Sequence, residues 1–155
     1  MENWFEGKTE IDSSLELIHT AMADAGQTYV EIVSLMPGIS EVELIDQGVD
    51  HVQIKTNEGT MLRNNIQVSS DDQHVTVEFD ETYNAGRLVS TEAHFRDEFR
   101  HNASGIIYHT IISDLNAHGI MGFFFRKFGS SNTGQAFLAA WKTHLENMHL
   151  SSLKP

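Results

Sequence analysis

The chain of 155 residues contains no cysteine. Disulfides, thiol nucleophiles and zinc sites with thiolate ligands are therefore excluded. No apolar run approaches the roughly 20 residues that a membrane-spanning helix needs. Charged side chains directly follow Trp4 and Phe5, so the first residues do not resemble a signal peptide. Together these absences predict a cytoplasmic protein that does not insert into a membrane.

Basic residues are also scarce. Ten Lys and Arg stand against 22 Asp and Glu, which gives a formal net charge of −12. Surfaces that bind nucleic acid phosphates or anionic lipid headgroups need basic patches, so the charge argues against both partners. The nine histidines include no pair at the i, i+4 spacing of a helical metal site, and we expect neither a metal nor a cofactor. His94 and His109 fall on neighbouring predicted strands, where we expect a solvent-facing pair.

The length and composition fit one globular domain. Apolar residues make up 40% of the chain and charged residues 21%, and no repeat, low-complexity segment or linker divides it. We therefore expect a single domain over residues 1–155.

The hydrophobic pattern changes its period along the chain. Residues 4–11 alternate as a strand does, and residues 15–36 carry apolar side chains at helical spacing. Asp12, Ser13 and Ser14 are N-cap candidates for this helical part, and Gly26 ends or interrupts it. From residue 39 to residue 115 the period is two. The turns between these strands are short, so the strands must be antiparallel.

One long helix is predicted over residues 120–150, where apolar or small side chains recur every three or four residues. Residues 129–134 have poor helix propensity and could split it. The apolar stripe keeps its phase across them, which favours one bent helix. Such a helix would cover the apolar face of the sheet. The pattern thus predicts an α+β fold: a curved antiparallel sheet of about seven strands around a long C-terminal helix, with two short helices after strand one.

Three segments resemble the START-like superfamily, which includes polyketide cyclases, lipid-transfer domains and the birch pollen allergen family. Residues 10–18 resemble the exit from its first strand, residues 37–42 the entry to its second strand, and residues 137–146 its closing helix. The resemblance implies the helix-grip fold over the whole chain, with a cavity between the sheet and the C-terminal helix. It also implies a small hydrophobic or amphipathic molecule as the ligand.

Candidate ligand-binding residues follow from this layout. They lie on the predicted inner faces of the strands or on the inward stripe of the C-terminal helix. They combine apolar walls with a few polar groups, as ligand pockets do. Small residues on the stripe either leave space for a ligand or allow a tight contact between helix and sheet. The candidates are Leu62, Asn64, Ile66, Val77, Phe79, Thr91, Phe95, Asp97, Tyr108, Phe124, Ser131, Gly134, Leu138 and Trp141.

Asp97 is the boldest of these candidates, because alternation places it with Phe95 and Phe99 on the inner face. A buried carboxylate there would be a candidate general acid or base. A bulge or frayed end near the turn at Asn102 would instead place it in water, and we favour that alternative.

Three functions remain open at this stage. The first is non-catalytic binding of a small hydrophobic ligand in the cavity. The second is an enzyme resembling polyketide cyclases or dehydratases, with Asp97, Asn64 or Tyr108 orienting an enolisable substrate. The third is a protein-interaction module whose cavity is filled. We favour the first and assign no catalytic residue.

Overall fold

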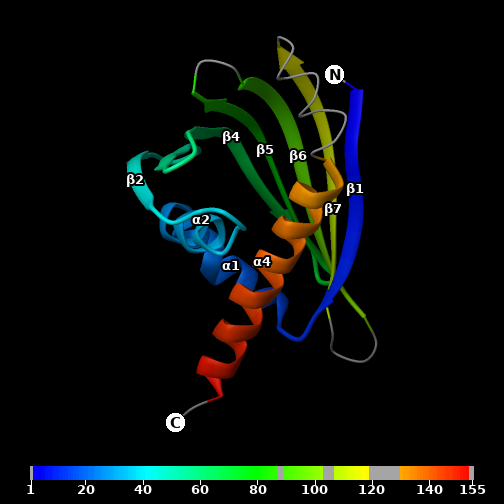
Figure 1. The fold of residues 1–155 in the computed structure, drawn as a ribbon. Helices are drawn as coiled ribbons and strands as arrows, with labels where there is room; N and C mark the ends of the chain where they lie inside the picture. Colours follow the sequence, from blue (N-terminus) through cyan, green and yellow to red (C-terminus); the bar gives the residue numbers. More distant parts are fainter. Residues whose placement is uncertain (1, 87–88, 103–106, 119–129, 154–155) are drawn as a thin grey trace.

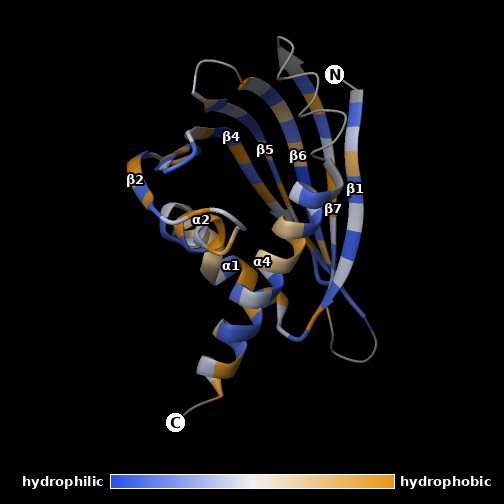
Figure 2. Cartoon of the chain, viewed as in Figure 1, coloured by the Kyte–Doolittle hydropathy of each residue, from blue (hydrophilic) through white to orange (hydrophobic). Residues whose placement is uncertain are grey.

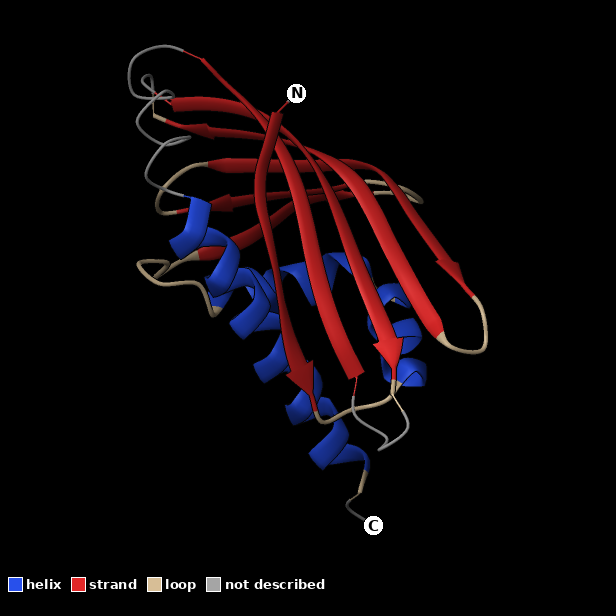
Figure 3. Ribbon diagram, turned by 90° about the vertical axis from the view of Figure 1, so that its right-hand side faces the viewer, coloured by secondary structure: helices blue, strands red, loops and turns tan. Residues whose placement is uncertain are grey.

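A computed structural model describes residues 2–86, 89–102, 107–118 and 130–153. Seven antiparallel strands form one sheet in the order β1-β7-β6-β5-β4-β3-β2. The strands are β1 (Glu2–Ile11), β2 (Val42–Gln47), β3 (Val52–Thr56), β4 (Thr60–Ser70), β5 (His74–Ala85), β6 (Val89–His101) and β7 (Ile107–His118). The helices α1 (Leu15–Ala23), α2 (Ala25–Ser34) and α4 (Ser130–Ser152) lie on one side of the curved sheet (Figures 1 and 3). The predicted fold class is confirmed.

The long C-terminal helix α4 crosses the concave face of the sheet (Figure 3). It begins at Ser130 and runs through Gly134 without a break. The first part of the predicted helix, including Phe124, lies outside the described residues. Within the described ranges, no helix combines the length and apolar character that a membrane crossing needs.

The break between the two short helices is at Asp24, and the expectation that Gly26 makes it is wrong. The backbone N–H of Asp24 donates to the carbonyl of Ala21 and closes α1. The Asp24 carboxylate accepts from the N–H of Gln27 at 3.3 Å and caps α2. Aspartate is a favoured N-cap because its side chain satisfies a free helical N–H. Gly26 lies buried inside α2.

Strand β4 changes its facing at a bulge. Asn65 adopts a positive φ of 52°, and the pairing with β5 shifts register between Asn64 and Gln67. Before the bulge, Arg63 is buried on the inner face, so its neighbours Leu62 and Asn64 face outward. The expectation that Leu62 and Asn64 face the cavity is therefore wrong, because the bulge inverts the alternation that was extrapolated across it.

Beyond the bulge, Val68 pairs with Val77, whose side chain is fully buried. Val68 and Ile66 are two residues apart and share that inner face. Ile66 is half-buried against the core.

The core fills the space between the concave face and the three helices. Figure 2 shows hydrophilic and hydrophobic residues alternating along the strands, which gives the sheet one apolar face. Tyr29 and Ile32 of α2 and Trp141 and Leu145 of α4 are at most 1% exposed. The Trp141 ring meets Tyr29 and Phe99 edge to face, with ring centroids 6.3 and 5.3 Å apart. These contacts tie both helices to the sheet.

Gly134 of α4 packs directly against Phe5 of β1. A Cβ atom added there would collide with the ring of Phe5. The same ring lies against Gly7, where an added Cβ would come within 2.6 Å of Phe5 Cζ. The small residues on the helical stripe were expected either to leave space for a ligand or to allow a tight contact between helix and sheet. At Gly134 the structure shows the tight contact.

We expect Gly134→Ala to destabilise the fold. Overpacking costs about 1–3 kcal/mol, which outweighs the roughly 1 kcal/mol by which Ala favours a helix over Gly. Chemical unfolding measures the change, with Gln135→Ala, at an exposed neighbouring position, as the control. In a Phe5→Leu background the same substitution should cost less. A Gly134→Ala protein more stable than the wild type would show that helix propensity alone governs this position.

Candidate functional site

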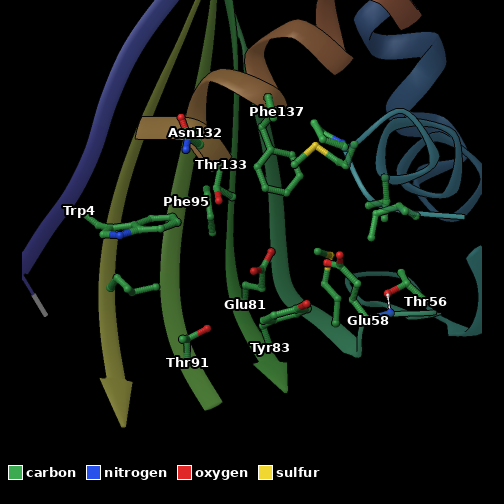
Figure 4. Close-up of a pocket in the computed structure, with 17 residues that line it drawn as sticks. Trp4, Thr56, Glu58, Glu81, Tyr83, Thr91, Phe95, Asn132, Thr133 and Phe137 are labelled. Atoms are coloured by element: carbon green, nitrogen blue, oxygen red, sulfur yellow. Dashed lines mark hydrogen bonds between the residues drawn. The ribbon is translucent and has the colours of Figure 1, made fainter. Parts of the chain in front are cut away.

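A cavity of about 280 Å³ lies between the first turns of α4, the α2–β2 connection and the inner face of the sheet (Figure 4). Every strand except β2 contributes to its wall. The lining residues are Trp4, Val33, Met36, Pro37, Ile39, Thr56, Glu58, Met61, Glu81, Tyr83, Thr91, Phe95, Leu115, Asn132, Thr133, Ala136 and Phe137. An apolar wall with a few polar groups is the usual make-up of a small-molecule site.

Two loops held together by Asn57 form one rim of the cavity. Its Oδ1 accepts from the N–H of Ser40 at 2.9 Å, and its Nδ2 donates to the carbonyl of Gly38 at 3.0 Å. Gly38 has a φ of 82°, a conformation that favours glycine. The Thr56 hydroxyl accepts from the N–H of Glu58 at 3.0 Å and fixes the β3–β4 turn. This turn places Glu58 at the edge of the cavity.

A buried ion pair lies beside the cavity, on strands β4 and β5. Arg63 Nε donates to Glu81 Oε2 at 2.9 Å, and the two side chains are 2% and 9% exposed. Register places the residues directly opposite each other on the inner face. A buried charge is tolerated when a partner of opposite sign and hydrogen bonds replace water. Here each residue provides that partner for the other.

Four aromatic rings surround the guanidinium of Arg63. Its Cζ lies 4.3 Å from the ring centroid of Phe79, 4.6 Å from Tyr29, 5.1 Å from Phe137 and 5.7 Å from Phe95. Arginine is less strongly hydrated than lysine and stacks on ring faces, which makes it the suitable cation for this position. Burial raises the pKa of the Tyr29 hydroxyl far above its ordinary value, although the guanidinium opposes the shift.

Glu81 and Tyr83 carry the polar side of the cavity wall. They lie two residues apart on β5 and point into the cavity (Figure 4). Burial raises the pKa of the Glu81 carboxyl above its usual value, and Arg63 opposes this shift. Burial also raises the pKa of the Tyr83 hydroxyl, and the charges of Glu58 and Glu81 add to it. Both carboxylates therefore act on the same part of the cavity.

Asp97 is buried in the core and paired, so the favoured expectation that it lies in water is wrong. A hydrogen bond of 2.8 Å joins its Oδ1 to Nε2 of His109, and the side chains are 3% and 0% exposed. The His109 ring stacks on Phe99 with centroids 4.2 Å apart. The expectation of a surface histidine pair is also wrong, because the continuous β6–β7 register turns His109 inward. His94 is half-buried on the outer face, where it bonds to Asp80.

Two predicted site residues, Thr91 and Phe95, line the cavity. Tyr108 lies on the outer face of β7, in a polar groove that includes Lys8 and Arg100. Ser131 lies in α4, and its side chain is outside what the structure describes. Four further candidates are at most 1% exposed and belong to the packed core: Val77, Phe79, Leu138 and Trp141.

The sequence reasoning missed Glu81, Tyr83 and Trp4. The alternation through Val77 and Phe79 continues to Glu81 and Tyr83, so period two was the signal that could have found them. Trp4 gave no such signal, because β1 shifts register between Asn3 and Phe5 and thereby buries two consecutive aromatic residues.

Among the described residues, no group of three or more His, Asp or Glu side chains could hold a metal ion.

No protein-family model and no curated protein matches the sequence. Solved structures do match the fold. The START superfamily protein from Mycobacterium smegmatis has a TM-score of 0.61 at 11% identity, over 94% of this chain and 99% of that one. The chain has a START-like helix-grip fold. The STAR-related lipid transfer protein from Xanthomonas axonopodis has a TM-score of 0.58 at 13% identity, over 90% and 84% of the two chains. Ara h 8.0201 has a TM-score of 0.58 at 14% identity, over 95% and 97%.

We expect Arg63→Met to destabilise the protein by about 3–5 kcal/mol, because it leaves the Glu81 carboxylate buried without its cation. The double variant Arg63→Met with Glu81→Leu should recover most of this loss. Arg96→Met is the matched control: Arg96 is 47% exposed and pairs with Glu78 and Glu98. Its removal should cost at most about 1 kcal/mol. Equal losses for both arginines in chemical unfolding would contradict the structural role of the buried pair.

Proposed function

We propose that the protein binds a small hydrophobic or amphipathic molecule in the cavity between the sheet and α4. The observation that carries this proposal is the cavity itself, which has an apolar wall and a few polar groups next to the packed core. Its volume of about 280 Å³ is close to the lower end of the range for ligand sites, about 300–1,000 Å³. A small molecule fits this volume better than a lipid with two acyl chains.

The fold comparisons support the same general function. One matching structure is described as a STAR-related lipid transfer protein, and a lipid is a hydrophobic or amphipathic molecule. The interaction-module alternative requires a filled cavity, and the open volume beside Phe95 and Phe137 argues against it.

The enzymatic alternative has less support. Asp97 is bonded to His109 in the core and does not line the cavity. Asn64 and Tyr108 lie on the outward faces of β4 and β7. General acid–base chemistry requires the catalytic group within hydrogen-bond reach of the substrate. The three residues considered for that role do not meet at the cavity, which favours binding without catalysis.

Titration with N-phenyl-1-naphthylamine, an uncharged fluorescent dye, tests the proposal. We expect saturable binding to the wild type. Ala136→Trp should weaken binding at least about tenfold, because Ala136 lines the cavity and the indole fills it. Ala139→Trp is the matched control, since Ala139 is exposed on the same helix and should leave the affinity unchanged.

Thermal unfolding and circular dichroism check that both variants are folded. Absence of dye binding to the wild type would overturn the proposal. Equal affinities of the two folded tryptophan variants would place the dye elsewhere and would overturn it as well.

A further inference from the structure

The polar part of the cavity wall is acidic. Glu81 lines the cavity from β5, and Glu58 lines it from the β3–β4 turn. None of the described lining residues is Lys, Arg or His. The remaining polar side-chain groups are the hydroxyls of Thr56, Tyr83, Thr91 and Thr133, the amide of Asn132 and the indole N–H of Trp4.

The nearby cation does not reach the cavity. Arg63 is 2% exposed and is absent from the lining residues. The rings of Phe95 and Phe137 lie within 6 Å of its Cζ and themselves form part of the cavity wall. An anion in the cavity would therefore meet aromatic carbon and carboxylate instead of guanidinium.

The carboxylate of Glu81 retains acceptor capacity toward the cavity. An ionised carboxylate offers about four lone-pair sites, and Arg63 Nε uses one of them, on Oε2. The hydroxyl of Tyr83, two residues along the same strand, adds a donor and acceptor on the same wall. A ligand that donates hydrogen bonds fits these groups, whereas a ligand with only acceptors leaves the carboxylate unmatched.

The net charge around the cavity also disfavours an anionic ligand. Glu58, Glu81 and Arg63 together carry one more negative charge than positive. A cationic ligand neutralises this excess, and an anionic ligand doubles it in surroundings where charges are poorly screened. The net charge of −12 adds a long-range field of the same sign.

We infer that the cavity selects a neutral or cationic amphiphile whose amine or hydroxyl group donates to Glu81, and that it rejects carboxylates and phosphates. This inference rests on the proposed binding function and specifies its ligand class. The apolar part of the ligand lies against Trp4, Phe95 and Phe137, and its polar end faces the carboxylates.

Displacement of N-phenyl-1-naphthylamine by three competitors of equal chain length tests the inference at pH 7 and low salt. The competitors are octylamine, octanol and octanoate. We expect octylamine to displace the dye at a concentration at least about tenfold lower than octanoate, with octanol between them. High salt should reduce the difference in potency between octylamine and octanoate. Equal potency of the three, or a preference for octanoate, would overturn the inference while leaving the binding function intact. Failure of the dye to bind would instead overturn the binding function.

Two variants locate the selectivity. Glu58→Gln removes a negative charge at the exposed edge of the cavity, so the fold should persist. The potency of octanoate relative to octylamine should rise about threefold or more. Glu81→Gln leaves Glu58 and Arg63 with no net charge between them, so the advantage of octylamine over octanoate should disappear. Glu92→Gln is the control with the same change in net charge, since Glu92 is exposed on the outer face of β6. It should leave the ratio unchanged.

If Glu81→Gln does not fold, the test is the comparison of Glu58→Gln with Glu92→Gln, in which the relative potency of octanoate and octylamine is measured. An equal change of the ratio in these two variants would show that only the overall charge acts, and the assignment to the cavity would be wrong.

Discussion

The guanidinium of Arg63 is enclosed by side chains from every layer of the molecule. Glu81 pairs with it from the neighbouring strand, Tyr29 covers it from α2, and Phe137 covers it from α4. A buried charge is costly unless its partners are in place. The two helices and the sheet must therefore keep their relative positions for the pair to be tolerated. The same arrangement sets one wall of the cavity, because Glu81 and Phe137 contribute to both.

The residues around the buried ion pair also form the part of the cavity wall that the proposed function requires. The rings of Phe95 and Phe137 lie beside the Arg63 guanidinium and also form part of the apolar cavity wall. The Glu81 carboxylate pairs with Arg63 and is also a polar group of that wall. Packing is tight on the other side of α4, where Gly134 lies against Phe5. The helix thus approaches the sheet closely at β1 and leaves space near Ala136 and the β3–β4 turn. A cavity beside a packed core suits the proposed binding function.

The sequence was sufficient for the architecture, because period two and period 3.6 report which faces are apolar. The sequence pattern failed where a bulge of one residue shifts the alternation of inward and outward side chains along a strand. Because of the bulge at Asn65, Leu62 and Asn64 lie on the opposite face of the sheet from the one predicted. Because of the register shift in β1, the alternation did not predict that Trp4 lines the cavity. Asp97 was placed in water because a bulge or a frayed strand end was expected near Asn102, and its buried partner His109 was separately assigned to the surface. Pairings between side chains far apart in the sequence are set by strand register, which local patterns do not contain. For the same reason, of the candidate residues that the structure describes, only Thr91 and Phe95 line the cavity.

Mass spectrometry of the purified protein under native conditions tests the central claim most directly. The wild type should carry a small molecule that is lost when the protein is unfolded, and the extracted molecule should be neutral or cationic at pH 7. The cavity-filling variant Ala136→Trp should carry much less of it, and Ala139→Trp the same amount. Equal amounts in all three proteins, or a wild type that carries nothing and takes up neither the dye nor octylamine, would contradict a ligand in this cavity.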